Sequence, residues 1–106
     1  MPEEESVPEG TELAIIELTF PIGTLVSTPG ALELVERLGA SPFDLLARHC
    51  RRDWGDLDDE DKRSNDHDLK HGGRLLSAYK MADGSKVWII TEWDRSVTTI
   101  LLPEEY

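Results

Sequence analysis

The sequence predicts one α+β domain, in which an antiparallel sheet of about four strands packs against two or three helices on one face. Its 106 residues are enough to bury a single core without disulfides or metals. Helix-start patterns occupy the first two thirds of the chain, and β-branched segments joined by turn sequences follow them. The expected order is β-α-α-α-β-β-β, and separate groups of helices and strands are typical of the α+β class.

The N-terminal residues 1–11 are predicted to form a disordered acidic tail, because they hold glutamates and prolines and almost nothing to bury. The domain is therefore placed at residues 12–106. From Leu13 the sequence "LAIIELTFPIGTLVST" is rich in β-branched residues. It predicts one strand, or two short strands broken at "PIG", since proline cannot donate to a central ladder.

Two short helices are expected next. Thr28 is a suitable N-cap followed by Pro29, and Gly39 ends the segment. Ser41 followed by Pro42 repeats the pattern and predicts a helical hairpin. The apolar residues expected on one side of each helix are Leu32, Val35 and Leu38 in the first, and Phe43, Leu46 and Cys50 in the second.

A third helix is expected from Asp58 to the glycines at 72 and 73, mostly on the surface because Leu69 is its only apolar residue. From Arg74 the periodicity becomes that of strands. The segment "RLLSAYKMADGSKVWIITE" predicts two strands joined by a turn at Asp83-Gly84, and "RSVTTILLP" predicts another after the turn "WDRS".

The overall charge is strongly acidic, with 22 Asp and Glu against 11 Lys and Arg and a formal net charge of -11. Such a field attracts basic protein partners and opposes non-specific nucleic-acid binding, which requires cationic contacts. Cys50 is the only cysteine, so no intrachain disulfide is possible. Without a signal-peptide pattern or a long apolar stretch, a cytoplasmic location with no membrane contact is expected. The sequence leaves the oligomeric state open.

The acidic charge is concentrated in residues 53–68, which contain eight carboxylates and only two basic side chains. Part of this charge is explained by a helix start, because acids there complement the helix dipole. The remaining excess predicts a docking surface for a basic partner. Its candidate residues are Asp53, Asp56, Asp58, Asp59, Glu60 and Asp61.

Metal binding is not expected, and neither is any other cofactor. The spacing of Asp56, Asp58 and Glu60 alternates as in a calcium loop, but the glycine and closing glutamate are missing. His67 and His71 lie one helical turn apart, like the histidine pair of zinc proteases. No spacing selects a third ligand, and a histidine near a helix C-terminus is a favourable dipole partner.

The segments "FPIGTLVSTPGALE", "DWGDLDDEDKRSND" and "GGRLLSAYKMADGSKVWIITEWDRSVTTILLPEEY" resemble a widespread family of small bacterial proteins described as uncharacterised or plasmid-related. The resemblance covers roughly residues 19–106. It implies carriage on mobile elements and supplies no activity. The sequence departs from that family at His67 and His71.

The order of elements is also similar to that of RelE- and barnase-like ribonucleases, which place helices before an antiparallel sheet. Such an enzyme needs a general acid or base and cations that stabilise phosphate charge. The candidates under this alternative are His71, Arg74, Tyr79 and Arg95. Arg95 is the most specific of these candidates, because "EWDRS" places it in a turn.

These observations favour a small, non-enzymatic interaction protein of bacteria or mobile elements. Its carboxylates would imitate phosphate spacing and occupy the basic groove of a DNA- or RNA-handling protein, as an anti-restriction or anti-CRISPR inhibitor does. The alternative is a RelE- or barnase-like ribonuclease toxin, or an inactive relative of one.

Overall fold

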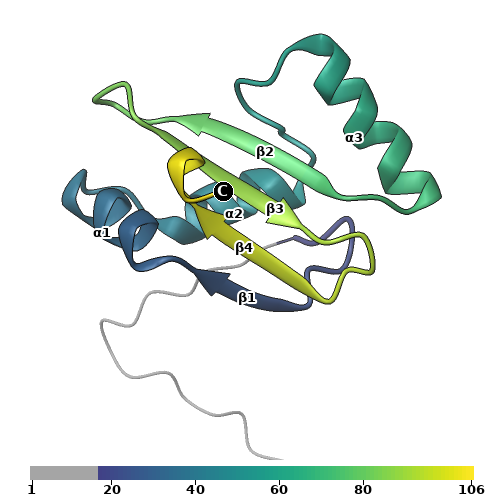
Figure 1. Ribbon diagram of the computed structural model, residues 1–106, viewed down its shortest axis with the longest axis horizontal. Helices are drawn as coiled ribbons and strands as arrows, with labels where there is room; N and C mark the ends of the chain where they lie inside the picture. The colour runs from purple at the N-terminus through teal and green to yellow at the C-terminus, as the bar shows by residue number, and fades with distance from the viewer. Residues whose placement is uncertain (1–16) are drawn as a thin grey trace, which may run out of the picture.

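The computed structural model describes residues 17–106, so the predictions for the tail at 1–11 and for residues 12–16 lie outside the described residues. The elements are β1 (Thr24–Ser27), α1 (Pro29–Arg37), α2 (Pro42–Cys50), α3 (Asp59–His71), β2 (Leu75–Lys80), β3 (Lys86–Thr91), β4 (Val97–Leu101) and a short 3₁₀ helix η1 (Pro103–Glu105). This order confirms the α+β class and the sequence of elements (Figure 1).

The four strands form one sheet in the order β1-β4-β3-β2. The last three strands are an antiparallel meander, as expected. The prediction of a fully antiparallel sheet is wrong, because β1 runs parallel to β4 and the sheet is mixed. No hairpin joins these two strands, so the long connection leaves the direction of β1 to tertiary contacts. Two of these contacts are hydrogen bonds from Thr98 Oγ1 to the Ile22 carbonyl at 2.8 Å and from the Thr28 amide to the Ile100 carbonyl at 2.9 Å.

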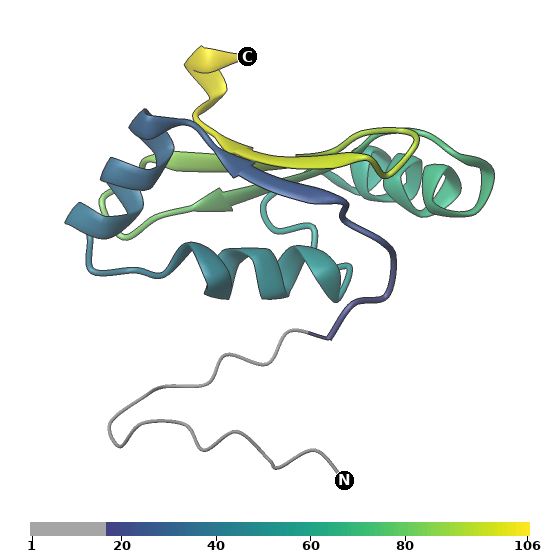
Figure 2. The same cartoon turned by 90° about the horizontal axis from the view of Figure 1, so that it is seen from below.

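The helices have two different positions relative to the sheet. Helices α1 and α2 lie across one face, and η1 rises from the other (Figure 2). Helix α3 lies beside the outer strand β2 instead (Figure 1). The expected layer of helices on one face is therefore made by α1 and α2, and α3 extends the domain sideways.

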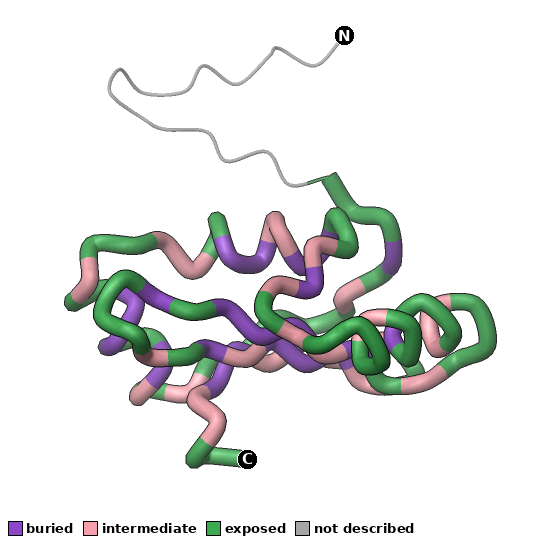
Figure 3. The backbone as a smooth tube through the Cα atoms, turned by 90° about the horizontal axis from the view of Figure 1, so that it is seen from above, coloured by how far each residue is buried: buried purple, intermediate pink, exposed green. Residues whose placement is uncertain are grey.

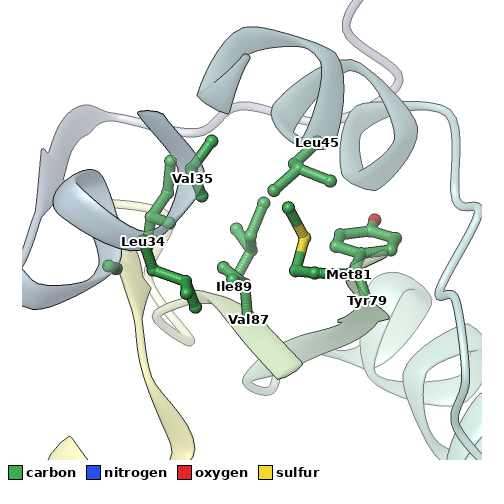
Figure 4. Close-up of a cluster of buried hydrophobic side chains, with 9 residues drawn as sticks. Leu34, Val35, Leu45, Tyr79, Met81, Val87 and Ile89 are labelled. Carbon is green, nitrogen blue, oxygen red and sulfur yellow. The ribbon is translucent and has the colours of Figure 1, made fainter. Parts of the chain in front are cut away.

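The main core lies between the sheet and the helical hairpin. Its side chains come from α1, α2 and the helix-facing positions of the strands, as Figure 4 shows for Leu34, Val35, Leu45, Tyr79, Met81, Val87 and Ile89.

The expected helix faces are confirmed in part, since Val35, Leu46 and Cys50 are buried as predicted. Helix α1 buries Ala31, Leu34 and Val35, and α2 buries Leu45, Leu46, His49 and Cys50. Leu32 and Phe43, expected to face the core, are 38% and 52% exposed. Both residues lie in the first turn of their helix and line a groove next to β1.

The predicted helix starts are confirmed. The side chain of Thr28 accepts a hydrogen bond from the Ala31 amide at 3.1 Å, and Ser41 and Asp58 cap α2 and α3 in the same way. Gly72, at a φ of 80°, ends α3, and Gly84, at a φ of 89°, makes the β2–β3 turn. Left-handed backbone of this kind favours glycine.

Candidate functional site

The acidic segment divides into carboxylates that hold the fold and carboxylates that do not. Asp53 belongs to the first group, since Arg48 Nε donates to its Oδ2 at 2.7 Å. This hydrogen bond holds the pKa of the Asp53 carboxyl below its usual value. Its backbone carbonyl accepts from the Tyr79 hydroxyl at 2.7 Å, and the Arg48 guanidinium lies 4.5 Å from the centroid of the Tyr79 ring. Asp53 therefore joins the end of α2 to β2.

Asp56 and Asp58 are also engaged within the chain. The Oδ2 atom of Asp56 accepts from the Lys80 amide at 2.7 Å, at the outer edge of β2. Asp58 is the N-cap of α3, where its Oδ1 accepts from the Asp61 amide at 2.8 Å. Of the six carboxylates predicted to bind a partner, these two and Asp53 have a structural role.

The other three, Asp59, Glu60 and Asp61, fill the first turn of α3 and are exposed. Within residues 17–106, none of the three forms an ion pair. Figure 3 shows α3 as a mostly exposed element beside the buried strands. These three side chains, here called the acidic turn, are the exposed part of the predicted surface that has no hydrogen bond or ion pair of its own within the described residues.

The attachment of α3 to the sheet was not anticipated from the sequence. Asn65 is the only buried residue of the helix. Its side-chain amide donates to the Leu76 carbonyl at 2.7 Å and its oxygen accepts from the Leu76 amide at 3.1 Å, as a neighbouring strand would. Trp54 Nε1 also donates to Asp66 at 3.2 Å. An asparagine in the middle of a helix is the sequence feature that hints at such a contact, since its helix propensity is poor.

The two histidines of α3 lie together on its exposed surface. The ring centroids of His67 and His71 are 4.5 Å apart, and His67 also lies 3.4 Å from a carboxylate oxygen of Asp68. Within the described part of the chain, no group of three or more His, Cys, Asp or Glu side chains is placed to hold a metal ion.

Three of the four residues considered for ribonuclease chemistry, Arg74, Tyr79 and Arg95, have structural partners. Tyr79 is fully buried on the helix-covered face of the sheet, and burial raises the pKa of its hydroxyl. Arg74 forms an ion pair with Glu92 at 3.2 Å and a hydrogen bond with the Tyr106 hydroxyl. Exposed His71 stands at the end of α3.

Arg95 is engaged most completely, at a left-handed φ of 60°. Its guanidinium donates to backbone carbonyls alone, and these carbonyls belong to Asp68, Gly73, Glu92 and Trp93. Arg95 thus joins the β3–β4 turn to the end of α3. Arg95 forms no ion pair with the neighbouring Glu92 or Asp94, and Glu92 pairs with Arg74 instead.

A second set of polar groups, missed as a set by the sequence analysis, lies buried between α2 and the sheet. His49 Nδ1 is 2.6 Å from Ser77 Oγ, and His49 Nε2 is 2.9 Å from Thr91 Oγ1. Thr91 Oγ1 is 2.8 Å from Thr98 Oγ1, which donates to the Ile22 carbonyl. Alternation places all three hydroxyls on the helix-facing side of their strands, where apolar residues are expected.

The direction of each proton in this buried chain follows from its last acceptor. A carbonyl oxygen only accepts, so the Thr98 hydroxyl must donate its hydrogen bond to Ile22. Thr98 Oγ1 therefore accepts the hydrogen bond that Thr91 donates. Thr91 Oγ1 in turn accepts a hydrogen bond from the Nε2–H group of His49, and His49 Nδ1 accepts one from the Ser77 hydroxyl. The neutral imidazole satisfies every bond, and burial lowers the pKa of His49 to about 4.

The Ser77–His49 pair has the composition of a nucleophile and its base, but both side chains have no exposed surface. Phe20 and Trp54 pack against the imidazole edge-to-face, with ring centroids 5.3 and 5.7 Å away. A substrate cannot reach the hydroxyl without unfolding this region. The geometry therefore indicates a structural polar core.

Comparisons with protein-family models, with curated proteins and with solved structures gave no match to the chain. Among residues 17–106, no helix is long and apolar enough to cross a membrane.

Proposed function

We propose that the chain is a small, non-enzymatic interaction protein that docks a basic groove of a DNA- or RNA-handling protein through the acidic turn. The observation that carries this proposal is the position of α3. Its thirteen residues bury only Asn65, so the helix contributes little to the core. It is held at the sheet edge by polar contacts and by the half-buried Leu69, which packs against a small apolar cluster. Its first turn presents three carboxylates to solvent.

The chemistry of the acidic turn suits such a groove. Exposed carboxylates on a rigid element imitate the negative charge of a nucleic-acid backbone, and the net charge of -11 steers a cationic partner toward the chain. Asp53, Asp56 and Asp58 support this surface indirectly, because they fix the segment that leads into α3. No contact of the described residues favours the ribonuclease alternative.

The test uses a synthetic Arg- and Lys-rich peptide of a DNA-binding type as the probe, with affinity measured by calorimetry at low and high NaCl. The test variant carries Asp59→Asn, Glu60→Gln and Asp61→Asn. The matched control removes the same charge from α1 and α2, through Glu33→Gln, Glu36→Gln and Asp44→Asn, and all three of these residues are exposed.

We expect the wild-type affinity to fall as salt rises, because the contacts are exposed charges. Neutralising the acidic turn should weaken binding about tenfold, at a few tenths to one kcal/mol for each exposed charge. The control should retain most of the affinity. Equal losses in both variants would show that only net charge matters, and the docking surface would then be wrong.

A further inference from the structure

The two edges of the sheet are finished in different ways. At the β2 edge, residues 54–56 and Asn65 take the place of a further strand. All three outward amides of β2 have an acceptor: Leu76 donates to Asn65 Oδ1, Ala78 to the Trp54 carbonyl, and Lys80 to Asp56 Oδ2. This edge is closed to another strand.

The β1 edge is open. The amides of Thr24 and Thr28 donate to the Ser96 and Ile100 carbonyls of the β4 side. Because successive residues of a strand alternate, Leu25 and Ser27 direct their backbone N–H and C=O groups away from β4. Within residues 17–106, no strand lies on that side of β1.

An apolar groove runs along this open edge, with a volume of about 190 Å³. Leu25 and Ser27 form its strand side, and Leu32, Pro42 and Phe43 form its helix side. Phe43 is 52% exposed and Leu25 is 37% exposed, so large apolar side chains border the unpaired backbone. An edge of this composition fits an extended, uncharged strand.

The surrounding sequence identifies the strand that fits. In a chain that is 31% charged, residues 18–32 contain no ionisable side chain. The acidic turn belongs to α3, which lies beside the opposite edge of the sheet (Figure 1). Two copies that meet at β1 therefore bring together strands without ionisable side chains and keep their acidic helices at the far ends.

We propose that a second copy of the chain pairs with the β1 edge, giving a two-fold symmetric dimer with a continuous eight-stranded sheet. In the antiparallel register centred on Val26, Leu25 pairs with Ser27 of the partner subunit, and Ser27 pairs with Leu25 of the partner subunit. These two pairs exchange four backbone hydrogen bonds.

Side-chain complementarity supports this register. Leu25 and Ser27 lie on the helix-facing side, since they align with Thr98 and Ile100 of β4. Each Leu25 therefore enters the partner's groove beside the small Ser27, where Leu32 and Phe43 are exposed. The two Val26 side chains meet at the axis on the other face, which covers a residue that is 42% exposed in the single chain.

The two acidic turns do not oppose this association. Eight strands separate the two β2 edges by seven spacings, about 34 Å in all. Repulsion across that distance is screened, because the Debye length is about 8 Å at physiological salt. Higher salt should therefore leave the dimer unchanged or strengthen it, whereas it should weaken docking to a basic peptide.

The test is analytical ultracentrifugation of the full chain at concentrations up to about 1 mM. This range covers the weak dissociation constant expected of a small interface. We expect a species of twice the chain mass of 11.9 kDa. Leu25→Glu should raise the dissociation constant at least about 100-fold, because it places an unpaired charge in the partner's groove. The matched control Leu18→Glu, at a residue that is 52% exposed and outside the groove, should leave it unchanged.

A second variant separates this register from general hydrophobic association. Ser27→Leu fills the position that Leu25 of the partner subunit would occupy, so it should weaken the dimer although it adds apolar surface. Circular dichroism confirms that each variant is folded. Hydrogen exchange should protect the Leu25 and Ser27 amides only at concentrations where the dimer forms.

Three results would overturn the proposal: a chain that stays monomeric throughout the range, a dimer that Leu25→Glu does not weaken, or edge amides that remain protected in the monomer. The last result would show that the chain's own N-terminal residues cover the edge. None of these results bears on peptide docking, because the acidic turn and the β1 edge lie at opposite edges of the sheet.

Discussion

Acidification should weaken the fold through His49, the buried imidazole between α2 and the sheet. Its pKa is lowered to about 4 by burial, while an unfolded chain has a histidine pKa near 6.5. Between these values the unfolded state binds the proton and the folded state does not, so stability falls as the pH decreases. The free energy of unfolding should drop by about 3 kcal/mol between neutral pH and pH 4.

The hydrogen bonds of His49 also oppose its protonation. Protonated His49 would donate from both nitrogens, so the Ser77 hydroxyl would lose the acceptor it now uses.

Asp53 affects stability in a separate, more acidic pH range. Its carboxyl pKa is depressed, so its contribution is present above the unfolded value of 3.8 and is lost only as the pH falls toward the folded pKa.

The assay is urea unfolding at several pH values from 7.5 to 4, followed by tryptophan fluorescence. Trp54 contributes to this signal from beside the imidazole. His49→Gln should be less stable than wild type at pH 7.5 by about 1 kcal/mol or more, but its stability should lack the loss below pH 6.5. His67→Gln, at an exposed histidine, should keep the wild-type slope. A His49→Gln variant with the wild-type slope would refute the assignment.

Two further substitutions test the backbone geometry around the sheet. Gly23→Ala should destabilise the fold by about 2 kcal/mol or more, because Gly23 has a φ of 62° and an added Cβ would overlap the Ser96 carbonyl. Gly39→Ala, at a φ of 70° with open space around it, measures the backbone cost alone, and an equal loss of melting temperature in both variants would contradict the predicted overlap. Asn65→Ala should cost about 1–3 kcal/mol in denaturant unfolding, because it leaves both backbone groups of Leu76 without their partner. An unchanged midpoint would mean that water replaces the amide.

The features that the sequence predicts well are those that depend on neighbouring residues. The side chain of Thr28 caps α1 through an amide only three positions away, so a short motif is enough to locate the helix start. The direction of β1 depends instead on contacts with Ile100, more than seventy positions later. No local pattern contains that information, and the sheet was expected to be fully antiparallel for this reason.

The candidate site follows the same division. The sequence located the acidic segment, but it could not show that Asp56 serves the Lys80 amide or that Asp53 pairs with Arg48. The polar residues of the core could be noticed singly, as hydroxyls at apolar positions of strands. Their hydrogen bonds around His49 depend on the strand register and on the position of α2, which no local pattern predicts. The resemblance to the plasmid-related bacterial family stays a prediction.

The attachment of α3 has a consequence for evolution and for protein engineering. A helix fixed by Asn65, with its cap at Asp58 and a contact from Trp54, constrains few of its own positions. Its exposed positions outside the acidic turn can change sequence without disturbing the core, so this part of the helix can diverge faster than the strands beside it. The same freedom makes it a place to graft a foreign recognition helix onto a domain that keeps its fold.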